Sequence, residues 1–187
     1  MDGYMMKPPN FDESKKYPVL FYVYGEPWGQ TARDTWQGNL WHLMLTQMGY
    51  IVITMDNRGT PSPKGRKWRK SIYRKIGVIN SRDQAMATKE VLKWDFVDPD
   101  RVAVWGWSGG GSMTLNLLFR YPEIYKTGMS VAPVSNQLYY DNIYQERYMG
   151  LPSENMEDFV EGSPITYAKN LEGNLLLIHG TADDNVH

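Results

Sequence analysis

A serine surrounded by glycines is the first candidate for chemistry in this sequence. Gly106-Trp107-Ser108-Gly109-Gly110 fits the pattern Gly-x-Ser-x-Gly, after an apolar run and before a helical pattern. This context is typical of a nucleophile elbow, a sharp strand-to-helix turn that exposes the serine hydroxyl. Glycines let neighbouring backbone approach closely, and the first amide of the helix can donate to a developing oxyanion. The alternatives are a phosphate-binding glycine loop and a plain strand-to-helix turn.

A nucleophilic serine needs a general base, and the base needs an acid that orients it. Asp183 and Asp184 follow the apolar stretch Asn174–His179, which places them at the end of a predicted strand. An aspartate in such a loop also commonly caps backbone amides. Both interpretations, a catalytic acid and a loop cap, are therefore open for these two residues.

The chain has three histidines, and none of them is well placed to be the base. His42 lies before the serine on a predicted helix, where we expect a packed or surface residue. His179 ends an apolar run, which predicts a hydrogen-bonded structural role. His187 comes only four residues after Asp183, whereas a parallel crossover takes about a dozen or more. We therefore expect the catalytic histidine to lie beyond residue 187.

Apolar, β-rich runs alternate with helical patterns, which favours an α/β fold with a mainly parallel, doubly wound sheet. Ligands of such sheets bind beyond the carboxyl ends of the strands. Strands are predicted at Val19–Tyr24, Tyr50–Met55, Arg101–Trp105, Thr127–Ala132 and Asn174–His179, and helices at Trp36–Met48, Ser81–Trp94 (with Ser81 as N-cap) and Ser112–Phe119. A solvated excursion is expected over Thr60–Lys75 and a mobile region over Tyr139–Ala168. The segments to search for function are those directly after the strands, including Tyr24–Trp28.

Composition narrows the class of protein. A chain of 187 residues with 42% hydrophobic residues suits one domain with a real core. The net charge of -1 provides no strong field for nucleic acid or an anionic membrane. The absence of cysteine excludes disulfides, cysteine nucleophiles and thiolate metal sites. No signal peptide is expected in the polar N-terminus, and no apolar run approaches the ~18 residues of a membrane span.

Several segments together resemble the dipeptidyl peptidase IV family of prolyl-oligopeptidase-type serine peptidases, and of its members the bacterial ones. The residues that carry the resemblance are Val23–Pro27, Asp56–Thr60, Trp105–Gly111, Ala132–Pro152 and Ile178–His187. The last two are far more specific than Gly-x-Ser-x-Gly. The resemblance implies that residues 1–187 form a partial α/β-hydrolase domain. It also implies that a β-propeller, the last strand and helix, and the catalytic histidine are absent from this chain.

The resemblance implies roles for the residues around the serine. Ser108 corresponds to the nucleophile and Asp183 to the acid of the triad, with Asp184 as the weaker choice. Tyr24 corresponds to the hydroxyl of the oxyanion hole and acts together with the amide of Gly109. Without the resemblance, Tyr24 would be interpreted as a packing residue at a strand end.

The resemblance also implies a substrate pocket. Asn185 corresponds to an amide that steadies a substrate carbonyl, and the walls around a proline ring correspond to Val134, Tyr140, Tyr144 and Val186. Packing at helical spacing is the alternative for the two tyrosines. Many family members carry Tyr at the position of Gly109 and Trp at that of Gln137. Both changes predict a wider or wetter pocket and a weaker preference for proline over alanine.

The function implied is that of a serine exopeptidase, which releases X-Pro or X-Ala dipeptides from free peptide N-termini through an acyl-enzyme. No metal or organic cofactor is implied. Family members are commonly periplasmic, secreted or membrane-associated, and often homodimeric. The alternatives are an acyl-peptide hydrolase, a prolyl endopeptidase on the same scaffold, and a non-catalytic truncated module. We expect residues 1–187 alone to be inactive as a peptidase and to associate through an uncovered sheet edge at Asn174–His179.

Overall fold

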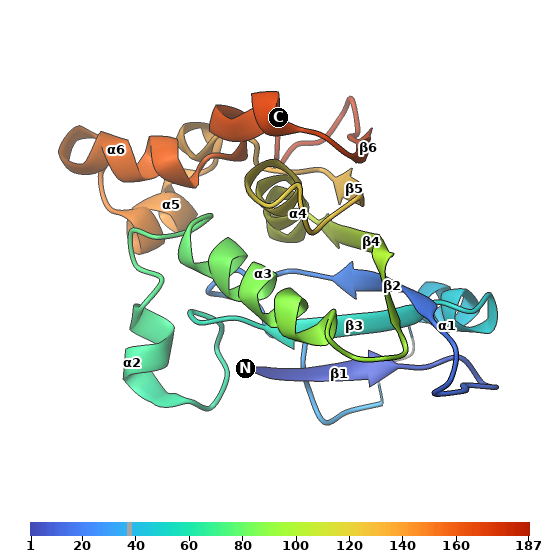
Figure 1. The fold of residues 1–187 in the computed structure, drawn as a ribbon. Helices are drawn as coiled ribbons and strands as arrows, with labels where there is room; N and C mark the ends of the chain where they lie inside the picture. Colours follow the sequence, from blue (N-terminus) through green and yellow to red (C-terminus); the bar gives the residue numbers. More distant parts are fainter. Residues whose placement is uncertain (37–38) are drawn as a thin grey trace.

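The computed structural model describes residues 1–36 and 39–187 and contains a sheet with strand order β1-β3-β2-β4-β5-β6 (Figure 1). The strands are β1 (Asp2–Met6), β2 (Tyr17–Tyr22), β3 (Ile51–Asp56), β4 (Val97–Trp107), β5 (Thr127–Val131) and β6 (Asn174–Ile178). β1 pairs with β3 in antiparallel fashion, and the pairs from β3 through β6 are parallel. The mainly parallel sheet predicted from the alternating pattern is confirmed.

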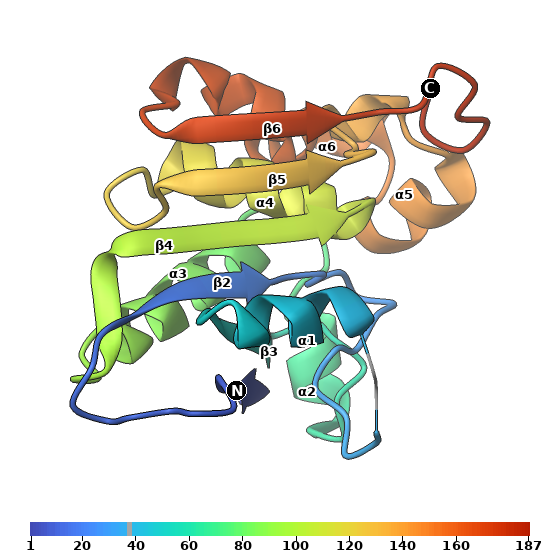
Figure 2. The same cartoon turned by 90° about the vertical axis from the view of Figure 1, so that its right-hand side faces the viewer.

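Helices cover both faces of this sheet. They are α1 (Leu40–Gln47), α2 (Gly65–Lys70), α3 (Ile79–Val91), α4 (Gly109–Arg120), α5 (Asn142–Met149) and α6 (Pro152–Gly162), with short 3-10 helices at Gln137–Tyr139 and Pro164–Asn170. Figure 2 shows α1 in front of β2 and β3, and α3 and α4 behind the sheet. The arrowheads of β4, β5 and β6 point to the side where α5 and the C-terminus lie. That side is therefore the edge at which a ligand site is expected.

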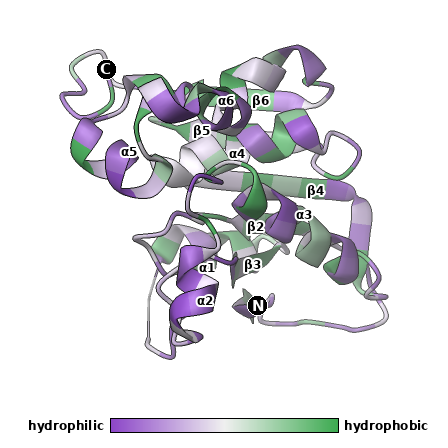
Figure 3. Cartoon of the chain, turned by 90° about the vertical axis from the view of Figure 1, so that its left-hand side faces the viewer, coloured by the Kyte–Doolittle hydropathy of each residue, from purple (hydrophilic) through white to green (hydrophobic). Residues whose placement is uncertain are grey.

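Burial on both faces explains why the central strands are continuously apolar. Phe21, Ile51 and Val104 are at most 1% exposed and pack in one core with Leu117 of α4. Figure 3 colours much of β2 and β3 as hydrophobic, whereas hydrophilic residues recur along α5 and α6. Within the described residues, no helix is long and apolar enough to cross a membrane.

Several predicted boundaries are wrong for local reasons. α1 begins at Leu40 rather than Trp36, because the Asn39 side chain accepts hydrogen bonds from the first backbone amides of the helix; residues 37–38 of that prediction lie outside the described residues. Ser81 is not an N-cap, since α3 already begins at Ile79 and the Ser81 hydroxyl donates to the Gly77 carbonyl at 2.7 Å.

The two segments predicted to be irregular contain helices. α2 lies within the basic stretch 60–75, and α5 and α6 lie within 139–168. β1 was not predicted at all. Its sequence, Asp-Gly-Tyr-Met-Met, has neither strict alternation nor a long apolar run, and its pairing with β3 is a long-range contact.

Candidate active site

Ser108 occupies a strained turn between β4 and α4. Its φ of 56° and ψ of −120° belong to a region that non-glycine residues rarely adopt. The Ser108 amide donates to the Val131 carbonyl at 2.8 Å, which ties the turn to the end of β5. A Cβ at Gly106 or Gly110 would collide with the Val23 carbonyl oxygen. Gly106 and Gly110 are therefore required by the close approach of Val23, the residue that follows β2.

Two hydrogen-bond donors line the same cavity as this serine. Gly109 is the first residue of α4, and amides in the first turn of a helix have no intrahelical acceptor. Tyr24 lines the same cavity as Ser108 and Gly109. Its ring lies against Gly29, where a Cβ would collide with it. Burial, aided by the neighbouring Glu26, raises the pKa of Tyr24 to about 12, so its hydroxyl keeps its proton at neutral pH.

A cavity of about 290 Å³ opens at the serine and brings together six of the residues proposed from the sequence. They are Ser108, Gly109, Tyr24, Val134, Tyr140 and Tyr144. A wider groove of about 720 Å³ between β1 and α3 includes none of the predicted site residues. The smaller cavity is therefore the candidate active site.

Tyrosines form one wall of the cavity. The rings of Tyr140 and Tyr144 meet edge to face, with centroids 5.5 Å apart. Tyr140 lies before α5, whereas Tyr144 lies within it, so helical spacing alone does not explain this pair. The Tyr140 hydroxyl donates to Asn185 Oδ1 at 3.3 Å. Asn185 and Val186 are not part of the cavity lining, and Tyr140 connects their loop to it.

The loop after β6 is organised by Asp183. Its Oδ1 accepts the amides of Val186 at 2.9 Å and Asn185 at 3.0 Å. These two bonds hold the pKa of the Asp183 carboxyl below its usual value. Asp183 thus acts as a loop cap, and its other oxygen, Oδ2, lies 3.7 Å from His179 Nε2. Asp184 is exposed and makes no comparable bonds among the described residues.

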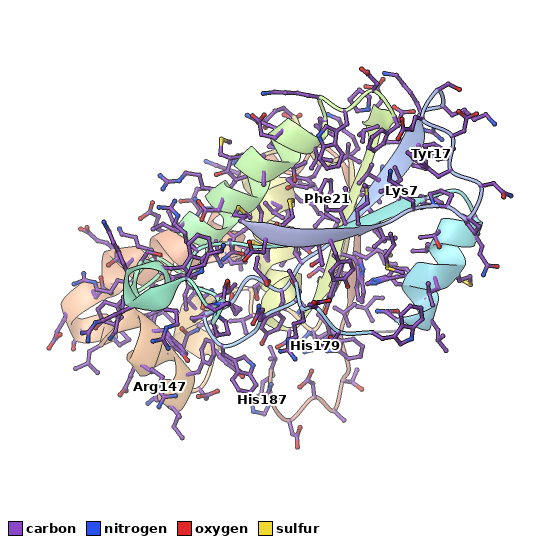
Figure 4. The ribbon with its side chains drawn as sticks, turned by 90° about the horizontal axis from the view of Figure 1, so that it is seen from below. Lys7, Tyr17, Phe21, Arg147, His179 and His187 are labelled. Carbon is purple, nitrogen blue, oxygen red and sulfur yellow. The ribbon has the colours of Figure 1, made fainter. Side chains whose placement is uncertain are left out.

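His42 and His179 bond to groups other than Ser108. His42 is 1% exposed, and its Nε2 accepts the Trp105 indole N–H at 3.0 Å. Burial lowers the pKa of His42 to about 4, so the ring is neutral. His179 Nε2 bonds to the Val186 carbonyl at 2.7 Å, which confirms the structural role expected for it. Figure 4 shows His179 and His187 on the side of the molecule opposite Tyr17. In the part of the chain that the structure describes, no histidine bonds to Ser108.

Sequence reasoning missed three polar residues of the cavity, Glu26, Ser112 and Gln145. Glu26 is 5% exposed and accepts the Tyr144 hydroxyl at 2.8 Å. A Cβ at Gly109 would collide with the Glu26 side chain. The space next to Gly109 is therefore filled by the Glu26 side chain and is not left open, as a wider pocket would require. The available signal for Glu26 was its place in Tyr24–Trp28, a segment that the sequence marks for a functional search without giving Glu26 a role.

The mainly parallel sheet and the strained serine at a strand-to-helix turn are features of the α/β-hydrolase fold. The chain belongs to the prolyl oligopeptidase family, whose model matches residues 36–187. It is 47% identical over 97% of its length to "Probable dipeptidyl-aminopeptidase B" of Arthroderma benhamiae, and 40% identical over 98% of its length to "Prolyl endopeptidase FAP" of Mus musculus.

A solved structure is also similar to this chain. The crystal structure of Porphyromonas gingivalis dipeptidyl peptidase 4 matches 99% of this chain with a TM-score of 0.95 and 40% identity. The chain covers 26% of that structure and about a fifth of the length of the Arthroderma benhamiae relative. The matches therefore concern one part of much longer proteins.

Proposed function

We propose that the whole protein is a serine exopeptidase that releases N-terminal dipeptides, with proline or alanine as the second residue. The observation that carries the proposal is the strained Ser108, which opens directly on a cavity with tyrosine walls. An aromatic and aliphatic box suits a proline ring, which offers apolar area and no N–H. The names of the fungal relative and of the Porphyromonas gingivalis structure support the same activity.

In the proposed reaction, Ser108 Oγ attacks the carbonyl carbon of the scissile bond while a general base takes its proton. The Tyr24 hydroxyl and the Gly109 amide donate to the oxygen that becomes negative. The base then gives its proton to the leaving amine, which leaves the dipeptide as an ester on Ser108. Water, activated by the same base, attacks this ester and releases the dipeptide with a free carboxyl group.

The base in this proposal is a histidine outside residues 1–187, oriented by Asp183. Support comes from the His42 and His179 contacts, which engage both rings elsewhere. It also comes from Asp183 Oδ2, to which no described backbone amide donates. A free peptide N-terminus is the proposed partner. Homodimerisation and a periplasmic, secreted or membrane-associated location belong to the same proposal and have the family resemblance as their support.

The test compares peptides with free and blocked N-termini. We expect the whole protein to release dipeptides from Gly-Pro and Gly-Ala substrates and to leave acetylated versions intact. Ser108→Ala should abolish this cleavage and the labelling by a fluorophosphonate, whereas Ser153→Ala, at an exposed serine of α6, should change neither. Cleavage of the acetylated peptides alone would favour an endopeptidase, the activity in the name of the mouse relative. Absence of both labelling and cleavage would favour a non-catalytic module.

A further inference from the structure

The turn after β2 directs an acidic residue into the candidate active site. Gly25 adopts a φ of 76°, and its carbonyl accepts the Asn57 side-chain amide at 2.9 Å. A side chain at Gly25 would collide with the end of Met113. The backbone before Glu26 is therefore held on both sides, and Glu26 lines the cavity beside Ser108.

Glu26 lies immediately beside the nucleophile turn. The methylene groups of its side chain occupy the space that a Cβ at Gly109 would need. The Glu26 side chain can therefore occupy this position only because residue 109 is a glycine. Glu26, whose carboxyl accepts the Tyr144 hydroxyl, therefore lines the same cavity as Ser108.

The carboxyl of Glu26 has few partners for a buried group. It accepts the Tyr144 hydroxyl at 2.8 Å, and none of the ion pairs among the described residues includes it. A carboxylate can accept about four hydrogen bonds, and burying it without a cation or enough donors is costly. Burial raises the pKa of Glu26 to about 7, against the opposing effect of the Tyr144 hydrogen bond.

Two buried glutamines line the same cavity. Gln137 and Gln145 are 3% and 4% exposed, and Gln145 Nε2 donates to Gln137 Oε1 at 2.5 Å. Gln145 Oε1 is buried without a hydrogen-bond partner in the described part of the chain. One acceptor of this pair, Gln145 Oε1, therefore lacks a donor among the described residues, whereas Gln137 Oε1 already has one.

We propose that Glu26 is a specificity-determining residue, which selects peptides whose second residue carries a hydrogen-bond donor on a short side chain. The donor is a hydroxyl or an amino group, and Glu26 accepts from it beside Ser108. Since the second residue enters this cavity only if the protein cleaves as proposed above, the inference rests on the proposed function. It adds a substrate class that an apolar box for proline does not predict.

Three substrates of equal size test this selection. Their second residue is 2-aminobutyrate, serine or 2,3-diaminopropionate, which end in a methyl, a hydroxyl and an amine. We expect the serine or diaminopropionate substrate to exceed the aminobutyrate substrate by ~10–100-fold in kcat/KM, the range for a hydrogen bond to a charged group. An advantage of serine alone identifies a hydroxyl as the selected donor, and an advantage of diaminopropionate alone identifies an amine.

Variants of the whole protein separate charge from shape. Glu26→Gln keeps the size and one acceptor oxygen but removes the negative charge, so it should reduce the diaminopropionate advantage at least ~10-fold. Glu157→Gln, at an exposed glutamate of α6, should leave all three values unchanged. The wild-type series decides the question by itself if Glu26→Gln fails to fold.

The two proposals fail in different ways. Equal kcat/KM for the three substrates, in a protein that cleaves them and is labelled at Ser108, would overturn the role of Glu26 and leave the peptidase activity standing. Absence of both cleavage and labelling would overturn the activity itself. An aminobutyrate advantage would contradict the selection of donors and indicate an apolar pocket.

Discussion

Backbone strain at Ser108 is a property of one residue that can be measured. Its φ of 56° costs a non-glycine residue about 1–3 kcal/mol. We expect Ser108→Gly to be more stable than Ser108→Ala by about 1 kcal/mol, because glycine relieves the strain. Thermal or urea unfolding of the two variants measures this difference.

The matched control for this prediction is Ser112 in α4, where an ordinary helical backbone should make the alanine variant the more stable one. If Ser108→Ala proved more stable than Ser108→Gly, the conclusion that the backbone at Ser108 is strained would be wrong.

His42 predicts a pH dependence of stability. Its pKa of about 4 in the folded chain lies below the ordinary value near 6.5, because the ring is buried. The unfolded chain therefore binds the proton more readily between these values, and stability falls as the pH decreases from about 6.5 to 4. The loss approaches about 3 kcal/mol, at 1.36 kcal/mol per pKa unit.

Urea unfolding at pH 7, 5.5 and 4 measures this loss. His42→Phe should remove this part of the pH dependence and also cost stability at pH 7, because Trp105 N–H loses its acceptor. An unchanged pH profile in the variant would assign the loss to other groups.

At the level of elements, apolar runs predicted the strands better than polar patterns predicted the helices. β2 to β6 lie where the runs are, because strands buried on both faces must be continuously apolar. α2 and α5 were missed because their helical residues are mostly polar, and docking against the rest of the fold compensates for weak local signals.

In the candidate active site, too, some features could be predicted from the sequence and others could not. Tyr24 received its role from the family resemblance alone, whereas Ser108 could be located because it follows a strand, and strand ends converge at one edge of a parallel sheet. The fit between Glu26 and Gly109 could not, because it depends on a contact between two elements distant in the sequence. Local propensity and spacing contain no information about which side chain fills a gap left by a glycine.

The close approach between α4 and Val23, just after β2, makes a prediction at Gly110. Alanine normally stabilises a helix by roughly 0.5–1 kcal/mol relative to glycine, but here its methyl group would collide with the Val23 carbonyl. Backbone cannot move as a side-chain tip does, so we expect Gly110→Ala to lower the free energy of unfolding by about 1–3 kcal/mol. Denaturant unfolding measures this change.

Gly180→Ala is the comparison for Gly110→Ala, because the nearest atom to an added Cβ there is 3.9 Å away; it should be nearly neutral. Equal effects at the two positions would mean that close packing is not the cause.

At the scale of the molecule, β6 ends the sheet within the described residues. Leu176, Leu177 and Ile178 of β6 are 52%, 56% and 46% exposed, whereas most of the apolar residues of the central strands are buried. This agrees with the uncovered edge expected at 174–179. An apolar edge strand presents unpaired backbone groups and apolar side chains together, which is the usual template for pairing with another chain.

A polypeptide of residues 1–187 should therefore self-associate through β6. We expect size-exclusion chromatography with light scattering to show a mass above the monomer that rises with concentration. Leu177→Lys should shift the polypeptide toward the monomer, because a lysine on an edge strand opposes strand pairing. Leu40→Lys is the matched control, since Leu40 is 77% exposed but lies on α1, away from this edge; it should leave the mass unchanged. A wild-type polypeptide that stays monomeric at high concentration, or an equal response to both lysines, would show that exposed apolar surface in general, and not the edge of β6, governs the association.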